Sequence, residues 1–373
     1  MPRPKLIIAS SESSADMLYA TGFRAPDPFV FLHDGEKKFL LLSDLEVDRG
    51  RQQAKVDRVD SFSEVEISVQ GGKMKKPAYA RVVAAWLRTN KARSAAVPAE
   101  FPLGLFRLLK KEGVRLKPAK GSFYPEREKK SASEVRAIEA AIRIAEAGMA
   151  RAMEILAATA PRKDGRLVFA RRILTSEILR TEIETAVVRA GGEAKGDTIV
   201  AGGDQACDPH GRGSGPLRAN ELIIIDIFPR DTRSGYHGDI TRTVVRGKAT
   251  DAQRKLWETC LAGHAMALEG MEPGNHGAAI HESIKAYFAG QGYPTEIRDG
   301  RWQGFFHGTG HGLGLEVHEP PRFAAATFLP GQVITVEPGI YIPGIGGVRH
   351  EDVALVTRSG PRLLTKAPKP MEI

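Results

Sequence analysis

Three histidines stand close together in a glycine-rich segment. Residues 306–321 read FHGTGHGLGLEVHEPP and carry His307, His311 and His318 within twelve positions. The glycines disfavour a stable helix but allow the backbone to approach a ligand closely. Most single histidines in a loop are surface residues. A cluster of neutral imidazoles on such backbone would instead suit a binding site, and the rest of the chain must decide between the two interpretations.

Carboxylates interrupt apolar strands at two places in LIIIDIFPRDTRSGYHGDITRTVV, residues 222–245. Asp226 continues a buried-looking strand, and the following strand carries Asp239. A carboxylate inside such a strand is costly unless it is paired, hydrogen-bonded or bound to a cation. The hairpin between the two strands would place the two carboxylates side by side.

Two further acids have the same character. Glu337 ends the apolar strand of GQVITVEPGIY, and GGVRHEDVALV places Glu351 in another strand. The alternation of side chains along a strand puts Arg349 on the face of Glu351 and turns His350 the other way. One such acid alone would be interpreted as a satisfied polar group of the core. Four of them, together with His311, indicate bound cations.

The charge of this set predicts the kind of cation. Four carboxylates carry about four negative charges, which two divalent ions would cancel, and oxygen ligands with one imidazole suit manganese-like ions. Two ions roughly 3.5 to 4 Å apart can share a hydroxide that is nucleophilic at neutral pH. Metal-assisted hydrolysis is therefore the predicted chemistry.

Two domains must position these residues. The first half alternates short apolar runs with helical patterns and predicts an α/β domain over residues 1–124. A polar break, GSFYPEREKKS, precedes a second domain over residues 125–373. Ser131 and Glu134 have the spacing of a capping box and predict a long helix there. Another helix is expected from Thr175 to Ala190, and two more near 250–270 and 276–290, before four or five short strands.

Composition excludes several classes of protein. The 373 residues are 42% hydrophobic and 27% charged, which is typical of an ordinary soluble protein. The net charge of +9 comes from scattered lysines and arginines without a nucleic-acid-binding motif, so no nucleic-acid partner is expected. The chain has no apolar run of membrane-spanning length, no signal-peptide pattern and only two cysteines. We therefore expect a cytoplasmic protein that does not bind membranes.

These motifs, in this order, resemble the pita-bread metallopeptidases, family M24, which include prolidase, aminopeptidase P and methionine aminopeptidase. The first half, with SADMLYATGFRAPDPF, also resembles the creatinase-type N-terminal domain of the proline-specific branch. The resemblance implies an α/β creatinase-like domain followed by an α+β pita-bread catalytic domain. It further implies two divalent metal ions, most often Mn²⁺ with Co²⁺ or Zn²⁺ as alternatives, peptide substrates with proline second, and a homodimer.

The resemblance also assigns roles to individual residues. Asp226 would bind one metal, Asp239 and Glu351 would bridge both, and His311 and Glu337 would complete the other. Glu337 would also move a proton to the leaving nitrogen, and His318 would hydrogen-bond the scissile carbonyl. His307 would contact the substrate beyond the cleaved bond, and His210 and Arg349 would lie at that end of the substrate.

One segment departs from the family pattern, and several alternatives stay open. The turn between Asp226 and Asp239 is two residues longer than usual, with Phe228 where glycine is common. An insertion of an even number of residues keeps both aspartates on one face.

Three other kinds of pita-bread protein are alternatives to a proline-specific peptidase. Methionine aminopeptidase lacks the N-terminal domain, creatinase lacks the metal ligands, and the catalytically silent binding proteins lose ligands. Within the proline-specific branch, the short first domain favours an Xaa-Pro dipeptidase over an aminopeptidase P acting on longer peptides.

Overall fold

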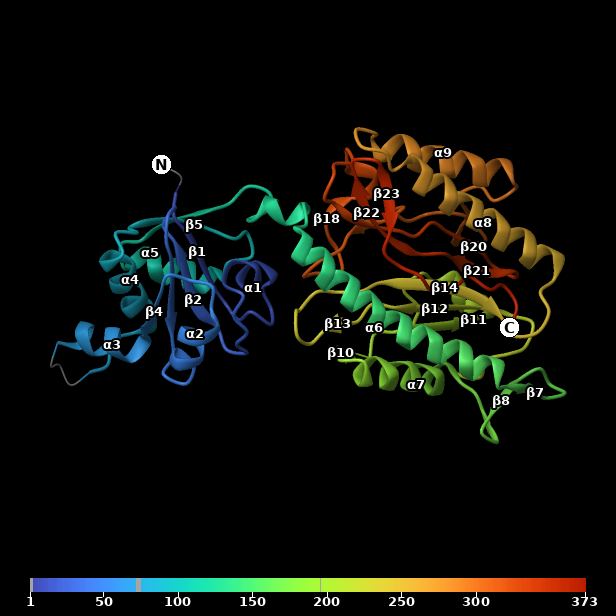
Figure 1. The fold of residues 1–373 in the computed structure, drawn as a ribbon, viewed down its shortest axis with the longest axis horizontal. Coiled ribbons are helices and arrows are strands. Elements are labelled where there is room, and N and C mark those ends of the chain that lie inside the picture. The colour runs from blue at the N-terminus through green and yellow to red at the C-terminus, as the bar shows by residue number, and fades with distance from the viewer. Residues whose placement is uncertain (1–2, 72–74, 195) are drawn as a thin grey trace. The chain divides into compact units, whose positions relative to one another are not determined.

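A computed structural model describes residues 3–71, 75–194 and 196–373 of the chain. The chain divides into two compact units, Met1–Pro125 and Glu126–Ile373. This division falls one residue from the domain boundary expected from the polar break. Figure 1 shows the helices and strands of both units.

The N-terminal unit is built on a six-stranded sheet with helices on both faces. The sheet has the order β4-β3-β2-β1-β5-β6. Its strands are β1 Lys5–Ala9, β2 Phe29–His33, β3 Lys38–Leu42, β4 Arg58–Ser61, β5 Ser94–Val97 and β6 Arg115–Pro118. Its helices are α1 Ala15–Thr21, α2 Val47–Gln53, α3 Phe62–Gln70, α4 Tyr79–Thr89 and α5 Leu103–Lys111. This is the α/β architecture that the apolar runs predict.

Side-chain alternation in β1 explains why both faces of this sheet are covered. Leu6 and Ile8 pack in one core with Trp86 of α4, whereas Ile7 packs in a second core with Met17 of α1. Each face of the strand is apolar, so each must be buried against a layer of helices.

The C-terminal unit places strands between two pairs of helices. Helices α6 Ala132–Ala157 and α7 Ser176–Arg189 lie on one side of the strands, and α8 Asp251–Gly270 and α9 Gly277–Gly290 lie on the other (Figure 1). One sheet has the order β11-β12-β14, and another has the order β18-β17-β19-β22-β23. The strands of these sheets are β11 Ile199–Gly202, β12 Leu222–Ile227, β14 Ile240–Val245, β17 His311–Gly312, β18 Glu319–Arg322, β19 Val333–Val336, β22 Asp352–Thr357 and β23 Gly360–Leu363.

Shorter elements complete the second unit. The strands β20 Gly339–Ile342 and β21 Gly346–Arg349 form a hairpin between β19 and β22 in the chain. Glu337 directly follows β19, and Glu351 directly precedes β22. The remaining strands are β7 Ala160–Pro161, β8 Leu167–Phe169, β9 Arg172–Ile173, β10 Gly192–Glu193, β13 Arg230–Asp231, β15 Glu296–Arg298 and β16 Arg301–Gln303. The 3₁₀ helices are η1 Pro125–Glu128, η2 Gly203–Cys207 and η3 Phe323–Ala325.

The long helix α6 begins where its capping signal predicts. The hydroxyl of Ser131 accepts a hydrogen bond from the Glu134 backbone N–H, and the Glu134 carboxylate accepts one from the Ser131 N–H. Such a cap stabilises a helix by about 1 kcal/mol. The apolar face of α6, including Met149, packs against Ile223 and Ile225 of β12. The helix therefore supports the strand that carries Asp226.

Two of the acids lie at strand ends rather than inside strands, which corrects the strand placement inferred from sequence. Asp239 directly precedes β14, and Glu351 lies between β21 and β22. At Glu351 the backbone N–H donates to the carbonyl of Thr241 at 3.2 Å, so the chain changes its pairing partner there. The alternation still separates the neighbouring side chains. His350 packs edge-on against Trp257, away from the acids, at a ring distance of 4.6 Å.

No helix within residues 3–71, 75–194 or 196–373 combines the length and the apolar character needed to cross a membrane.

Candidate metal centre

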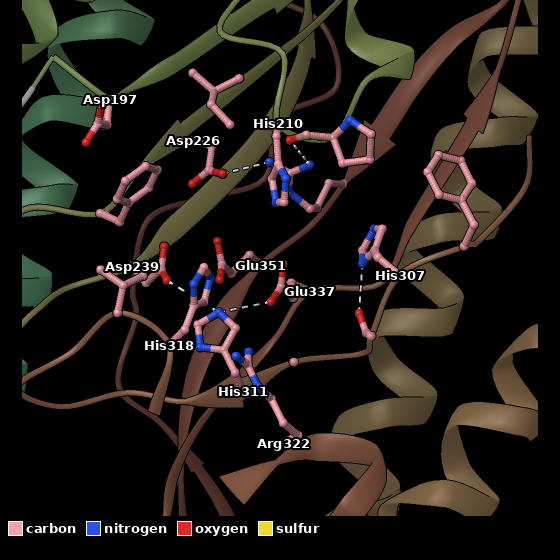
Figure 2. Close-up of a pocket in the computed structure, with 18 of the residues that line it drawn as sticks. Asp197, His210, Asp226, Asp239, His307, His311, His318, Arg322, Glu337 and Glu351 are labelled. Carbon is pink, nitrogen blue, oxygen red and sulfur yellow. Dashed lines mark hydrogen bonds and ion pairs between the residues drawn. The ribbon is translucent and has the colours of Figure 1, made fainter. Parts of the chain in front are cut away.

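One cavity of about 940 Å³ collects every site residue that the sequence predicts. Its walls include the five candidate ligands, namely Asp226, Asp239, His311, Glu337 and Glu351. They also include the four candidate substrate or catalytic residues, namely His210, His307, His318 and Arg349. Figure 2 shows the carboxylates of Asp239, Glu337 and Glu351 gathered around the ring of His311. Segments more than 100 residues apart in the chain thus meet in one place.

The pairing of β12 with β14 brings the two aspartates to the same wall. Asp226 lies opposite Thr241 in this antiparallel pair, and Asp239 stands two residues before Thr241. Residues two apart in extended chain point to the same side, so both carboxylates can enter the cavity. The longer turn does not disturb this arrangement, and Phe228 from that turn also lines the cavity.

Glycine allows the His311 segment to lie directly on β19. A Cβ atom at Gly310 would stand 1.8 Å from the carbonyl oxygen of Thr335, a distance that no other residue could accept. The Thr335 hydroxyl then accepts a hydrogen bond from the His311 N–H at 3.0 Å. His311 Nδ1 donates to the carbonyl of Gly312 at 3.1 Å, which turns Nε2 toward the acids.

Three of the residues meet a geometric condition for binding a metal. Asp239, His311 and Glu351 are buried, and each offers a ligand atom within 4.8 Å of the others. Glu351 Oε2 is oriented by the Thr241 hydroxyl, which donates to it at 2.8 Å. Among the residues that the structure describes, none forms a hydrogen bond with the buried Asp226 Oδ1 in this cavity. A carboxylate oxygen in this position fits a cation ligand, because a buried acceptor otherwise loses the hydrogen bonds it had with water.

Burial opposes the ionisation of the bridging candidates. It raises the pKa of Asp239 and of Glu351 well above the ordinary values, and repulsion from neighbouring carboxylates adds to the shift. Burial also raises the pKa of Asp226, against the opposing charge of Arg349. A bound cation would reverse this balance, because it favours the charged form of each ligand.

Glu337 and His311 form a charged pair beside these acids. His311 Nε2 lies 3.2 Å from Glu337 Oε1 and 3.9 Å from Asp239 Oδ2. Burial disfavours the charged form of Glu337, but the hydrogen bond and charge of His311 outweigh it and lower the pKa to about 2. Burial likewise disfavours protonated His311, yet Glu337 raises its pKa.

Arg349 is buried behind the carboxylates and is fully engaged there. Its Nη2 donates to Asp226 Oδ2 at 2.7 Å, and its Nη1 donates to the Tyr341 hydroxyl at 2.9 Å. Nη1 also lies 3.3 Å from the carbonyl oxygen of Pro209. The resemblance places an arginine near the end of the substrate. Arg349 lines the cavity, but its guanidinium is held by protein groups.

The three other histidines lie around the ligand cluster. His307 Nδ1 donates to the carbonyl of Gly308 at 2.8 Å, and Nε2 accepts from the Tyr341 hydroxyl at 2.9 Å. Burial lowers the pKa of His307 to about 4. The ring of His318 lies edge-on to His311 at a centroid distance of 4.4 Å, and burial together with the charge of His311 lowers its pKa. The ring of His210 stands above the cavity in Figure 2, across from His318.

Sequence reasoning missed the charged rim of the cavity. The rim residues Asp197, Arg212 and Arg322 line it together with the candidate ligands. Asp197 precedes β11, Arg212 follows η2, and Arg322 ends β18. These positions have no motif or periodicity in common. Only the folded chain brings them to one opening.

A cavity with several buried acids and a histidine, on strands held between two helix pairs, defines a metal-dependent hydrolase of the pita-bread class. The model of the family described as metallopeptidase family M24 matches residues 136–358. The chain belongs to this family and is a metallopeptidase that uses divalent metal ions.

Individual relatives support the same classification. An Xaa-Pro dipeptidase of Pyrococcus horikoshii is 32% identical over 281 residues, which cover 74% of this chain and 73% of that protein. The solved structure of an Xaa-Pro dipeptidase from Bacillus anthracis has a TM-score of 0.81 and 25% identity, covering 99% of this chain and 95% of that one. An X-Pro aminopeptidase from Thermotoga maritima also has a TM-score of 0.81, at 23% identity, covering 99% and 97%, and supports the fold. These neighbours confirm the predicted N-terminal domain followed by a C-terminal pita-bread domain.

Proposed function

We propose that this chain hydrolyses the Xaa-Pro peptide bond with two divalent metal ions and prefers Xaa-Pro dipeptides. The observation that carries the proposal is the convergence of four carboxylates and His311 in one cavity. The similarity to the Pyrococcus horikoshii Xaa-Pro dipeptidase supports the choice of substrate. Attack on a peptide bond beside proline is the reaction that both features fit.

The proposed ligand assignment follows the family pattern. Asp226 would bind one ion, Asp239 and Glu351 would bridge both, and His311 and Glu337 would complete the second. The four negative charges support two divalent ions, and the mainly oxygen donor set supports manganese, with cobalt or zinc as substitutes. When bound, such ions polarise a carbonyl and lower the pKa of a water molecule to near neutrality.

The remaining residues handle the proton and the substrate. Glu337, which His311 holds in the ionised form, can accept a proton from water and deliver it to the leaving nitrogen. The ring of His318 is exposed to the cavity and can donate a hydrogen bond to the scissile carbonyl oxygen as negative charge develops there. His307 and His210 contact the substrate beyond the cleaved bond.

The carboxylate of the substrate provides the preference for dipeptides. A dipeptide presents this group directly after proline, whereas a longer peptide has a neutral amide there. His210 lines the cavity and can act as a donor at this position, while the neutral ring of His307 contacts the same end of the substrate without a free N–H. The buried charge of Arg349 adds attraction while its guanidinium holds Asp226. A charge-assisted contact at this point also positions the scissile carbonyl at the candidate metal centre.

One feature favours the alternative, an aminopeptidase P that acts on longer peptides. A second cavity of about 430 Å³ adjoins the first beyond His307 and shares Phe306, His307, Gly308 and Ala324 with it. This space could receive residues that follow the proline. The two functions therefore differ in whether this second cavity contributes to substrate binding.

The decisive experiment compares kcat/KM for Ala-Pro and Ala-Pro-Ala in manganese-loaded protein. We expect the dipeptide to be cleaved faster. A clear preference for the tripeptide would make the protein an aminopeptidase P. Full activity after chelation would contradict the metal-dependent reaction, and turnover confined to peptides without proline would contradict the substrate assignment.

The oligomeric state and location are also proposals. We infer a homodimer from the family resemblance, and we propose the cytoplasmic location that the composition of the chain favours. Light scattering of the purified protein and fractionation of cells would test these two statements.

A further inference from the structure

The residue that follows His318 carries a buried negative charge. Glu319 is 2% exposed, and its two carboxylate oxygens accept from different cations. Lys130 Nζ donates to Oε1 at 2.5 Å, and Arg127 Nη2 donates to Oε2 at 2.5 Å. The Lys130 side chain is only 1% exposed. This ion cluster therefore lies in the interior, immediately beside a residue to which the proposed reaction gives a role.

The two cations come from the segment that leads into α6. Arg127 belongs to η1, and Lys130 directly precedes the N-cap Ser131. Two further hydrogen bonds hold Lys130 in place. Its Nζ donates to the carbonyl oxygen of Arg127 at 2.6 Å, and its backbone N–H donates to the carbonyl oxygen of Gly331 at 2.7 Å. The ammonium group thus has a defined position before it meets Glu319.

The carboxylate of Glu319 also shapes the segment that carries His318. Residues 314–318 form neither helix nor strand. The Glu319 side chain fills the inside of this bend, because a Cβ atom at Gly314 would stand 2.4 Å from Glu319 Oε1. Glu319 Oε2 further accepts from the Glu316 N–H at 3.4 Å, and Arg127 Nη2 donates to Glu316 Oε2 at 2.8 Å. The bend is built around one charged group.

A buried carboxylate keeps this position only if its charge is compensated. Two cations and the bend itself supply that compensation here. Loss of the Lys130 charge would favour movement of Glu319 toward water, and the backbone of residues 314–318 would follow. The His318 side chain is partly open to solvent and packs edge-on against His311, so its orientation depends mainly on the backbone that carries it.

We propose that Lys130 and Glu319 are positioning residues whose buried ion pair holds the 314–319 bend, and through it His318, in the orientation that the reaction needs. The inference rests on the proposed function for the role of His318. The ordering of the bend is a separate physical claim that can be measured without any substrate.

The test uses the full chain and two independent variants, Lys130→Met and Glu319→Gln. We expect kcat for Ala-Pro to fall by about tenfold or more, because a displacement of about 1 Å at a catalytic group can cost a hundredfold. KM and metal content should change less than about twofold. Amide hydrogen exchange in residues 313–318 should rise by about tenfold or more in the metal-free protein. If one variant does not fold, the other provides the same readouts.

Two comparisons separate positioning from general stability. The double variant should lose no more activity than the worse single variant, because both changes break one unit. Arg246→Met is the matched control. Arg246 Nη2 donates to the carbonyl of Thr159 at 2.6 Å, and Thr159 lies just beyond the C-terminal end of α6. It should lower the melting temperature while leaving exchange at 313–318 and kcat unchanged.

The outcomes distinguish the two levels of the proposal. Unchanged exchange at 313–318 in folded variants would overturn the positioning role, and so would an equal loss of kcat in Arg246→Met. Increased exchange with unchanged kcat would show that the bend is ordered without serving the reaction, which also overturns it. A wild-type protein that cleaves no Xaa-Pro peptide would overturn the proposed function instead.

Discussion

Arg349 donates a hydrogen bond from Nη2 to Oδ2 of Asp226 at 2.7 Å, and both residues are buried. The two residues are 123 positions apart in the chain. The contact leaves Oδ1 of Asp226 at the cavity without a hydrogen-bond partner in the described part of the chain. Arg349 therefore orients the carboxylate and leaves one oxygen available for a cation, as partners of metal ligands commonly do.

The first prediction concerns this contact. Arg349→Met should lower metal affinity or kcat/KM by about 10 to 100-fold, because Asp226 loses the group that orients it. Arg349→Lys should restore little, since one ammonium cannot reproduce bonds to both Asp226 and Tyr341. Metal titration and kinetics would measure both effects. Wild-type affinity and rate in Arg349→Met would show that the contact does not support the site.

The second prediction concerns the bridging candidates. Asp239→Asn and Glu351→Gln should each abolish measurable activity and remove one or both metal ions, since a bridging carboxylate serves two ions. Metal content per chain and kcat would be measured together. Glu221→Gln, at a half-buried acid outside the cavity lining, is the control and should retain both. Unchanged stoichiometry and rate in either bridging variant would exclude that residue from the metal centre.

Removal of metal should destabilise the protein. The cavity holds four carboxylates within a buried space, and a cation that binds only the folded state stabilises it by about 2.7 kcal/mol at 100 times its Kd. Chelator-treated protein should melt several degrees lower than manganese-loaded protein. Calorimetry with and without Mn²⁺ would show the difference, and equal melting temperatures would argue against binding at this cavity.

His318 should affect the rate and not the metal. His318→Ala should lower kcat by about 10²- to 10⁴-fold, the usual range for a group that assists the reaction directly. Metal content should stay at the wild-type level because His318 lies beside His311 without belonging to the ligand set. A kcat close to wild type, or loss of metal, would contradict this role.

The fifth prediction follows from the lowered pKa of His307, which is about 4. The unfolded chain takes up a proton at this histidine near pH 6.5, whereas the folded chain does so only near pH 4. This difference costs stability once the pH falls below 6.5, and the cost is complete below pH 4. His307→Gln should therefore gain stability relative to wild type between pH 7 and pH 5.

Urea unfolding of wild type and His307→Gln at pH 7 and pH 5 would measure this effect. The difference in free energy of unfolding should shift in favour of the variant at pH 5. The same difference at both pH values would show that His307 is not held neutral by burial.

The individual ligand candidates could be recognised from the sequence for a local reason. Asp226 interrupts an isoleucine-rich strand, and Glu337 ends an apolar strand, so each contradicts the burial of its neighbours. A single charged residue in such a setting is visible without any knowledge of the partner strands. The capping box at Ser131 was equally local, and the structure confirms it.

The helices α2 and α3 could not be recognised in the same way. No side chain of α3 is buried, and α2 buries only Val47 and Gly50. A helix with so little buried surface has a weak apolar periodicity, which is the signal that sequence analysis uses. The strand assignments of Asp239 and Glu351 failed for a related reason, because hydrophobic pattern does not mark where a strand changes partner.

The sequence by itself determined which residues are candidates for the metal centre, because residue type and alternation are properties of short segments. Only the tertiary structure decided what these residues touch. The bond from Arg349 to Asp226, the rim of Asp197 and Arg322, and the ion pair of Lys130 with Glu319 each join segments about 100 residues apart or more. Contacts of this kind depend on which strands and helices become neighbours, and that choice is made by the packing of the whole domain rather than by any local pattern.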